Sequence, residues 1–191
     1  MTHVQAHDID AFVGMIEAFR DLQATLCLVA PPHEAAAEMT AAIEDLTDRL
    51  RHFEVAEGQR TARELGMQGL GHPILVPYES TDTSDDSMLG SVTFGFAHMG
   101  STDTVHGGVI TLLFDDVLGM FVSRKGQPDS RTAFLKVDYR SATPVCRELR
   151  VTATIDSIEG RKTFVRGALL DGDVVCAEAR ALFVRLPSGR S

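Results

Sequence analysis

The stretch VHGGVITLLFDDVLG, residues 105–119, constrains this chain more than any other segment. Apolar residues recur in it at a spacing that predicts a helix over residues 108–122. The two glycines and two adjacent aspartates are unusual there. Glycine costs a helix interior about 1 kcal/mol relative to alanine, and a carboxylate among apolar side chains needs a partner. Because so apolar a helix must be surrounded, we expect a strongly curved antiparallel sheet to wrap around it.

The two faces of this expected helix differ in chemistry. At about 100° per residue, one broad face is apolar and the opposite stripe is small and polar. The apolar face contains Ile110, Phe114, Val117 and Phe121, and the polar stripe contains Gly108, Thr111, Asp115 and Gly119. Asp116 lies off that stripe. The two aspartates are therefore not equivalent, and we expect Asp115 to face an open space.

The helix begins at His106-Gly107-Gly108. Its first backbone N–H groups have no acceptor within the helix, and the helix dipole favours negative charge at this end. Without Cβ atoms on the glycines, a ligand oxygen can approach those N–H groups closely. This arrangement is typical of an oxyanion hole for acyl transfer. The alternative is that the glycines only permit a tight entry turn.

The spacing of Gly107 and Asp115 bears on assembly. The two residues are eight positions apart, which is roughly 12 Å along one helix axis. One reacting carbon cannot easily lie about 3 Å from groups on both residues. A twofold axis between two copies, with antiparallel helices, would bring Asp115 of one copy opposite Gly107 of the other. If the two residues share a site, the active unit is therefore a dimer.

The rest of the chain is expected to be helical at its start and mostly strand after the central helix. Residues 8–56 predict a helical hairpin with one apolar seam, broken by the sequence APP at 30–32. Before the central helix we expect a short strand at 73–78, a polar turn at 80–87 and a strand at 91–99. Four further strands are expected at 132–140, 147–158, 161–172 and 174–186. The fold class is α+β, divided into a hairpin (1–56), a linker with a short first strand (57–87) and a core domain (88–191).

Charge and composition exclude several classes of function. The net charge is −9, with 5 basic and 16 acidic residues in positions 1–100 against 13 and 11 afterwards, which argues against a nucleic-acid partner. The sequence has no apolar run of about 18 residues and no basic signal-peptide flank, so we expect a cytoplasmic protein without a membrane partner. The three cysteines are scattered, which favours reduced thiols. The sequence lacks GxSxG, P-loop and HExxH motifs, and we expect no metal.

The stretch at 105–119 closely resembles the signature of hotdog-fold acyl-CoA thioesterases of the phenylacetate-pathway (PaaI-type) branch. The resemblance extends through TAFLKVDYRSATPVCRELRV and RKTFVRGALLDGDVVCAEARALFV, and covers roughly residues 88–186. It implies the hotdog fold, in which an antiparallel sheet wraps around a central apolar helix. It also implies hydrolysis of an acyl-CoA thioester to free CoA and a carboxylic acid.

The resemblance implies roles for single positions. The acid matching Asp115 acts as general base or nucleophile, the backbone N–H matching Gly107 polarises the thioester carbonyl, and Thr132, seven positions before Tyr139, helps to orient water. The site then lies between two subunits of a homodimer or a dimer of dimers, and needs no cofactor beyond the CoA of the substrate. We assign to substrate binding His106, Gly108, Thr111 and His98, together with Arg140, Arg161 and Lys162 as candidates for the CoA phosphates.

One position departs from the family pattern. Many relatives have Asn or Gln six residues before the motif histidine, where this chain has Gly100. His98, Ser101 or Thr102 is a possible replacement, or the donor is absent. A non-catalytic acyl-CoA-binding protein is therefore an alternative. A hotdog dehydratase or hydratase is a weaker one, because His106 lies about half a helical turn round from Asp115.

Overall fold

The computed structural model describes residues 6–56, 59, 71–101 and 103–187 of the 191-residue chain. Within them lie the α-helices α1 (Ala6–Leu26), α2 (His33–Arg51) and α4 (Gly107–Arg124), and the short 3₁₀ helix η2 (Phe96–His98). The strands are β1 (Tyr78–Ser84), β2 (Ser87–Thr93), β3 (Ser130–Tyr139), β4 (Glu148–Glu159), β5 (Lys162–Asp171) and β6 (Val174–Arg185).

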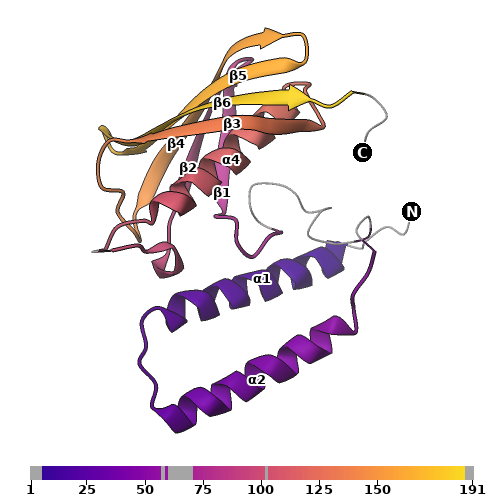
Figure 1. The fold of residues 1–191 in the computed structure, drawn as a ribbon, viewed down its shortest axis with the longest axis vertical. Helices are drawn as coiled ribbons and strands as arrows, with labels where there is room; N and C mark the ends of the chain where they lie inside the picture. The colour runs from indigo at the N-terminus through magenta and orange to yellow at the C-terminus, as the bar shows by residue number, and fades with distance from the viewer. Residues whose placement is uncertain (1–5, 57–58, 60–70, 102, 188–191) are drawn as a thin grey trace.

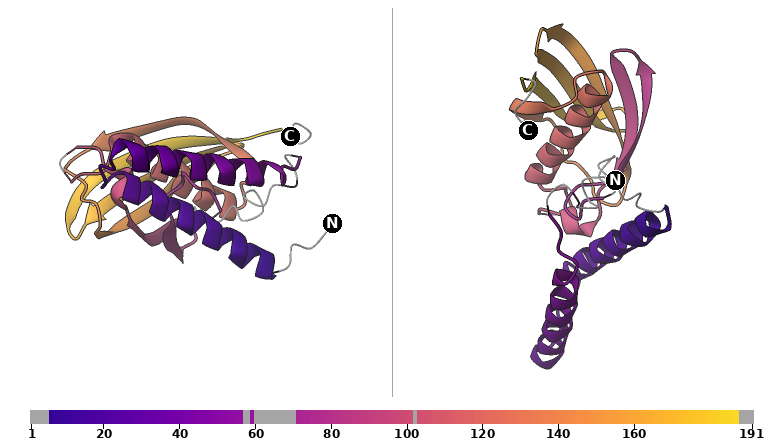
Figure 2. Two further views of the ribbon diagram at one scale, coloured as in Figure 1. Left: turned by 90° about the horizontal axis from the view of Figure 1, so that it is seen from below. Right: turned by 90° about the vertical axis from the view of Figure 1, so that its right-hand side faces the viewer.

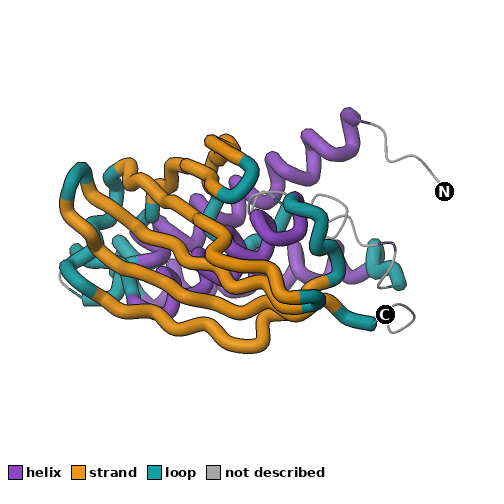
Figure 3. Tube along the Cα trace, turned by 90° about the horizontal axis from the view of Figure 1, so that it is seen from above, coloured by secondary structure: helices purple, strands orange, loops and turns teal. Residues whose placement is uncertain are grey.

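The six described strands form one antiparallel sheet that curves around α4 (Figures 1 and 2). Their order is β1-β2-β4-β5-β6-β3, so β1 and β3 are the edge strands. Figure 3 shows the strands side by side, with the helices on one side of them. The expected sheet wrapped around a central apolar helix is confirmed, as are the four strands after that helix.

The core lies between α4 and the inner face of the sheet. The seven buried residues of α4 are Ile110, Leu113, Phe114, Val117, Leu118, Phe121 and Val122. They include the whole apolar face that the helical spacing predicts, and they pack against alternate residues of the strands, such as Leu149, Val151 and Leu169. Burying one side chain of this size contributes roughly 1.5–3 kcal/mol, so this contact is the main source of stability.

Two glycines allow α4 and the sheet to approach closely. A Cβ atom on Gly167 of β5 would lie 2.9 Å from the carbonyl oxygen of Thr152 and 3.1 Å from a methyl group of Leu118. A Cβ atom on Gly119 would lie 3.2 Å from the ring of Phe183. The helix is therefore seated on a part of the sheet where a side chain has no space.

The first strand differs from the expectation. We expected a strand at 73–78 and a turn at 80–87, but β1 covers Tyr78–Ser84 and the turn is confined to residues 85–86. β1 is an edge strand with a mostly exposed outer face, so its sequence is polar. It therefore lacks the apolar residues by which a strand is predicted. The strand expected at 91–99 instead ends at Thr93 and is followed by η2.

The N-terminal helices are present where the sequence predicts them, with Pro32 as the N-cap of α2. The predicted single apolar seam does not join the two helices, because α1 and α2 diverge in the right-hand view of Figure 2 and α2 has no buried residue. Helix α1 packs on η2 instead, and buries Ile16. Arg20 fastens α1 by donating to the carbonyl oxygens of His72 and Leu75. Among the described residues, no helix combines the length and hydropathy needed to cross a membrane.

Gly167→Ala tests the close seating of α4. The added methyl group must displace either the β4 backbone or the helix, so we expect the free energy of unfolding to fall by about 1–3 kcal/mol. Chemical denaturation measures this change. The control is Gly95→Ala, where a Cβ atom has nothing within 4 Å and the expected change is within about 0.5 kcal/mol. Equal stability of both variants would contradict the inferred contact.

Candidate functional site

Asp115 lies exposed on α4, on the polar stripe that the helical spacing predicts. The hydroxyl of Thr132, on the neighbouring strand β3, donates a hydrogen bond of 2.8 Å to Asp115 Oδ1. Both residues line a pocket of about 230 Å³. The rest of its wall mixes the apolar side chains of Leu75, Leu112, Met120 and Phe183 with the polar residues Asp116, Ser130 and Arg131. A carboxylate with one oxygen held by a hydroxyl therefore opens into a small pocket of mixed polarity.

The N-terminus of α4 has one N–H group without an acceptor. His106 is the N-cap, and its Nδ1 accepts the N–H of Gly108 at 3.0 Å. The N–H groups of Val109 and Ile110 both donate to the carbonyl oxygen of His106. Of the first four helix N–H groups, only that of Gly107 has no acceptor within the part of the chain that the structure describes. This N–H is therefore available to a ligand oxygen.

Tyr139 anchors Gly107. Its hydroxyl donates to the Gly107 carbonyl oxygen at 2.7 Å and lies 2.9 Å from Thr111 Oγ1, which itself lies 3.1 Å from the same carbonyl oxygen. A Cβ atom on Gly107 would meet the Tyr139 ring at 3.1 Å, so glycine is required for this contact. The sequence analysis named Tyr139 only to locate Thr132 and predicted no role for it. Its position at the end of the strand that begins near Thr132 was the one indication that it could lie near the start of the helix.

The two polar groups lie at opposite ends of the contact between α4 and β3. Asp115 meets Thr132 near the start of β3, and Gly107 meets Tyr139 at its end. Seven residues of strand span roughly 23 Å, and the helix rises roughly 12 Å between Gly107 and Asp115. Within one chain, the carboxylate and the available N–H therefore cannot contact the same small group.

The second aspartate, Asp116, has a different environment. Its Oδ2 is buried and has no hydrogen-bond partner among the described residues. Burial and, to a smaller extent, the negative charge of Asp115 together raise the pKa of Asp116 to about 6. The Tyr78 hydroxyl is likewise buried and without a described partner. Burial and the charge of Asp116 raise the pKa of Tyr78, while the charge of Arg124 opposes them.

The loop before α4 explains why position 100 is glycine. A Cβ atom on Gly100 would lie 3.1 Å from the Cα atom of His106, so a longer side chain would displace the helix start. The ring of His98 is already engaged, because its Nδ1 accepts the N–H of Gly95 and its edge packs on Phe94. Burial lowers the pKa of His98, and the charge of Arg20 acts in the same direction. Ser101 is exposed, and Thr102 lies outside the described residues.

The three candidate cations for CoA phosphates lie at two ends of the sheet. Arg140 follows β3 beside the Gly107 end and forms an ion pair of 2.7 Å with Glu178, which raises the pKa of Arg140. Arg161 and Lys162 lie at the β4–β5 turn, where β6 ends and β3 begins, and Arg161 donates to the carbonyl oxygen of Arg185. Their binding roles, like those of His106, Gly108, Thr111 and His98, stay predictions.

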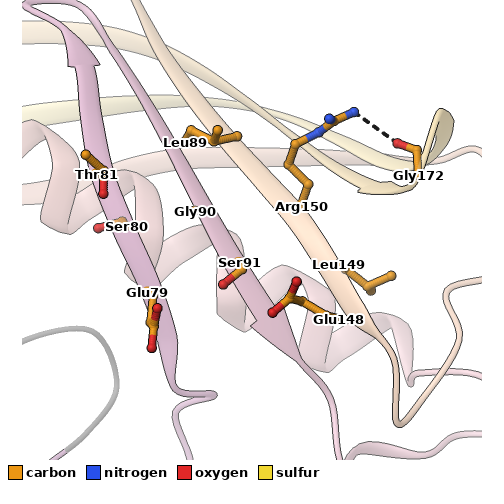
Figure 4. Close-up of a pocket in the computed structure, with 10 residues that line it drawn as sticks. All are labelled: Glu79, Ser80, Thr81, Leu89, Gly90, Ser91, Glu148, Leu149, Arg150 and Gly172. Atoms are coloured by element: carbon orange, nitrogen blue, oxygen red, sulfur yellow. Dashed lines mark hydrogen bonds between the residues drawn. The ribbon is translucent and has the colours of Figure 1, made fainter.

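A separate hollow of about 390 Å³ lies on the outer face of β1, β2 and β4 (Figure 4). Glu79, Ser91, Glu148 and Arg150 line it, and Arg150 donates to the Gly172 carbonyl oxygen at 3.0 Å. It contains none of the predicted site residues, since it opens on the face away from α4. Elsewhere in the described part of the chain, no three His, Cys, Asp or Glu side chains gather closely enough to hold a metal ion.

Asp116→Asn tests the strain at the buried carboxylate. Because folding raises the pKa of Asp116 from 3.8 to about 6, the proton-bound form favours the fold, and that stability is lost as pH rises between about 4 and 6. Asparagine has no such loss. Relative to the parent chain, we expect the variant to gain about 1–3 kcal/mol of unfolding free energy at pH 7.5 and much less at pH 4. Denaturation at both pH values measures this, and a pH-independent difference would contradict it.

Known proteins resemble this chain in sequence and in fold. Residues 102–178 match the model of the Thioesterase superfamily. Acyl-coenzyme A thioesterase THEM4 of Mus musculus is 29% identical over 121 residues, which cover 62% of this chain and 50% of that protein. The protein of the same name from Rattus norvegicus is 29% identical over 136 residues, covering 70% and 56%. The chain therefore spans about half the length of these curated relatives.

Solved structures extend the comparison to the N-terminal helices. A thioesterase superfamily protein superposes with a TM-score of 0.79 at 26% identity, covering 91% of this chain and 90% of that chain. This share includes more than the sheet and α4. A hypothetical thioesterase from Streptococcus pneumoniae TIGR4, solved with coenzyme A, shares the fold at 15% identity, with a TM-score of 0.53 and coverage of 57% and 85%. The chain thus has the hotdog fold preceded by two helices, and its residues 102–178 carry the match to the thioesterase superfamily.

Proposed function

We propose that this chain is an acyl-CoA thioesterase of the PaaI type, whose site is shared between two copies. The observation that carries the proposal is that α4 has two reactive groups: an available N–H at Gly107 and an exposed carboxylate at Asp115. Thioester hydrolysis needs both an electrophilic donor for the developing oxyanion and a base or nucleophile. The substrate is an acyl-CoA, as the name of the THEM4 relatives indicates for those proteins.

Asp115 supplies the carboxylate. The Thr132 hydroxyl occupies Oδ1, which leaves Oδ2 to act on the substrate. In one route Asp115 removes a proton from water, the water oxygen bonds to the thioester carbon, the C–S bond breaks and the proton passes to the CoA sulfur. In the other route Oδ2 attacks the carbon, releases the thiolate and forms an anhydride that water then opens. Both routes use the same geometry.

Gly107 supplies the oxyanion donor. Its N–H stands at the positive end of the α4 dipole, where a developing negative charge is stabilised. The Tyr139 hydroxyl bond to the Gly107 carbonyl holds this residue in place before the substrate binds. A donor that needs no reorganisation during the reaction contributes most to the rate. Tyr139 therefore acts as a positioning residue.

In the proposed dimer, a second copy brings the Gly107 N–H close to the Asp115 carboxylate. Strand β3 ends the sheet, and its free edge carries the exposed side chains of Phe134 and Tyr139. Exposed apolar edge strands tend to pair with another chain. If two β3 strands pair antiparallel about a twofold axis, the sheet continues and the two α4 helices lie antiparallel, with Asp115 near the partner's Gly107. We propose this dimer as the active unit.

Two observations bear on the alternatives. His106 Nδ1 accepts the N–H of Gly108, so this ring caps the helix instead of facing Asp115, which disfavours a dehydratase or hydratase. Gly100 offers no side-chain donor to the carbonyl, which favours the alternative of a non-catalytic acyl-CoA-binding protein. We further place the protein in the cytoplasm, since the thiols of Cys27, Cys146 and Cys176 are all free.

Asp115→Asn should remove hydrolysis. Asparagine keeps the shape and the contact to Thr132 but can neither take a proton nor attack, so we expect kcat to fall at least about 100-fold. Release of free CoA thiol from a panel of acyl-CoA esters measures this. The matched control is Asp116→Asn, for which we expect a loss below about tenfold. If neither the parent chain nor the variants release thiol while CoA still binds, the non-catalytic alternative is correct.

Mixed dimers test whether the site is shared. Asp115→Asn and Gly107→Val are each expected to be inactive in both sites of a homodimer. The first removes the carboxylate, and the second adds a side chain that meets the Tyr139 ring and displaces the residue 107 N–H. After the two variants are unfolded and refolded together, half of the dimers are mixed and contain one intact site, so activity should return to about a quarter of the parent value. Recovery is measured against each variant refolded alone. No recovery despite mixed dimers, verified by mass, would show that the site lies within one chain.

A further inference from the structure

Helix α2 presents an uncovered apolar face. Its large apolar side chains, and that of Phe53 two residues beyond its end, are 40–78% exposed: Met39, Ile43, Leu46, Leu50 and Phe53. No residue of α2 is buried; the helix stands away from the sheet (Figure 1) and diverges from α1 in the right-hand view of Figure 2. Of the 17 exposed large apolar residues in the described chain, 11 lie between residues 15 and 55. The uncovered apolar surface is therefore concentrated on the N-terminal helices.

The spacing on α2 is that of a coiled coil. The five apolar residues are separated by alternating steps of four and three, and Ala36 extends the series by one step toward the N-terminus. Alternate steps of this kind repeat every 3.5 residues, which keeps one seam facing a second helix through knobs-into-holes packing. A helix that packs on a sheet needs a broader face than this seam. The pattern therefore predicts another helix as the occupant.

We propose that α2 pairs with α2 of a second copy, antiparallel, about a point between Glu44 and Asp45. This register places Met39 opposite Leu50 of the other copy, Ile43 opposite Leu46, and Ala36 opposite Phe53. The seam residues alternate between heptad positions a and d. In this register each a residue of one helix packs on a d residue of the other, as antiparallel coiled coils require. The smallest residue of the seam meets the largest. A parallel pair would set alanine against alanine and phenylalanine against phenylalanine, leaving a gap at one end and crowding at the other.

The helix dipoles favour the same direction. Arg49 and Arg51 form ion pairs with Asp45 and Asp48 of their own helix, so these side chains do not set the direction. Antiparallel pairing brings the opposite ends of the two helix dipoles together, whereas parallel pairing sets like ends against each other. The helix as a whole has five acidic and two basic residues. Such a face is unsuited to an anionic membrane surface, which selects basic amphipathic helices.

The short length of α2 limits the strength of this helix–helix contact. Nineteen residues form a helix of roughly 28 Å, which holds little more than two heptads. So short a pair is marginal as the only contact between two proteins. The α2 pair therefore adds to another contact between copies of this chain. The inference does not depend on thioesterase activity, because none of the seam residues belongs to the candidate site.

Leu46→Asp in the full chain tests the pairing. A charge in the central layer should halve the mass of the assembly, or raise its dissociation constant at least tenfold, in sedimentation measured over a range of concentrations. The matched control, Ala41→Asp, adds the same charge to the exposed polar face of α2 and should leave the mass unchanged. An unchanged mass for Leu46→Asp overturns the proposal. A lower melting temperature at unchanged mass also overturns it, since α2 would then pack on its own chain.

Cross-linking tests the direction. Ala36→Cys and Phe53→Cys are made separately in a chain whose exposed cysteines are replaced, Cys27→Ser and Cys146→Ser. With a short bis-maleimide linker, a mixture of the two variants should give a covalent pair joining residue 36 to residue 53. Phe53→Cys alone should give little product, because antiparallel packing holds the two copies of that residue far apart. Efficient linking of Phe53→Cys to itself would show a parallel pair and overturn the register.

Discussion

The burial of α4 inside the curved sheet is the contact on which the rest of the structure depends. Once strands cover the apolar face of the helix, only a narrow stripe remains outside the core, and Asp115 lies on it. Strand β3 borders that stripe as the last strand of the sheet, and it supplies both polar partners, Thr132 at its start and Tyr139 at its end. The candidate site is therefore set by how the helix is covered and where the sheet stops.

A buried carboxylate lies next to the candidate site on the same helix. Asp116 lies beside the polar stripe and is half-buried, while Gly119 and Gly167 let the same helix lie close to the strands. The buried oxygen of Asp116 lies without a described partner, and the pKa of Asp116 rises accordingly. Asp115, one residue earlier, stays exposed. The rotation of about 100° per residue along the helix is enough to place one carboxylate in solvent and the next one partly inside the protein.

Much of this could be predicted from the sequence where local pattern reports burial. The spacing of Ile110, Phe114 and Val117 indicated the covered face of α4, and alternation indicated the four later strands. The first strand was placed too early, at 73–78, because an exposed edge strand needs few apolar residues and β1 covers the polar stretch Tyr78–Ser84. The Gly107–Tyr139 contact escaped detection because it joins residues 32 positions apart, and no local pattern encodes such a distance. The α2 seam was visible, but its exposure depends on tertiary contacts alone.

The two proposed contacts between copies of this chain have different consequences. The free edge of β3 borders the site, so pairing there would complete catalysis by joining Asp115 to the partner's Gly107. The α2 seam lies on a helix away from the sheet, so pairing there would change assembly without touching the reacting groups. Two self-complementary contacts with different twofold axes close into a dimer of dimers, whereas one shared axis gives a dimer. The proposed catalysis and the proposed α2 pairing would then be separable, because α4 carries the reacting groups of the first and α2 the contact of the second.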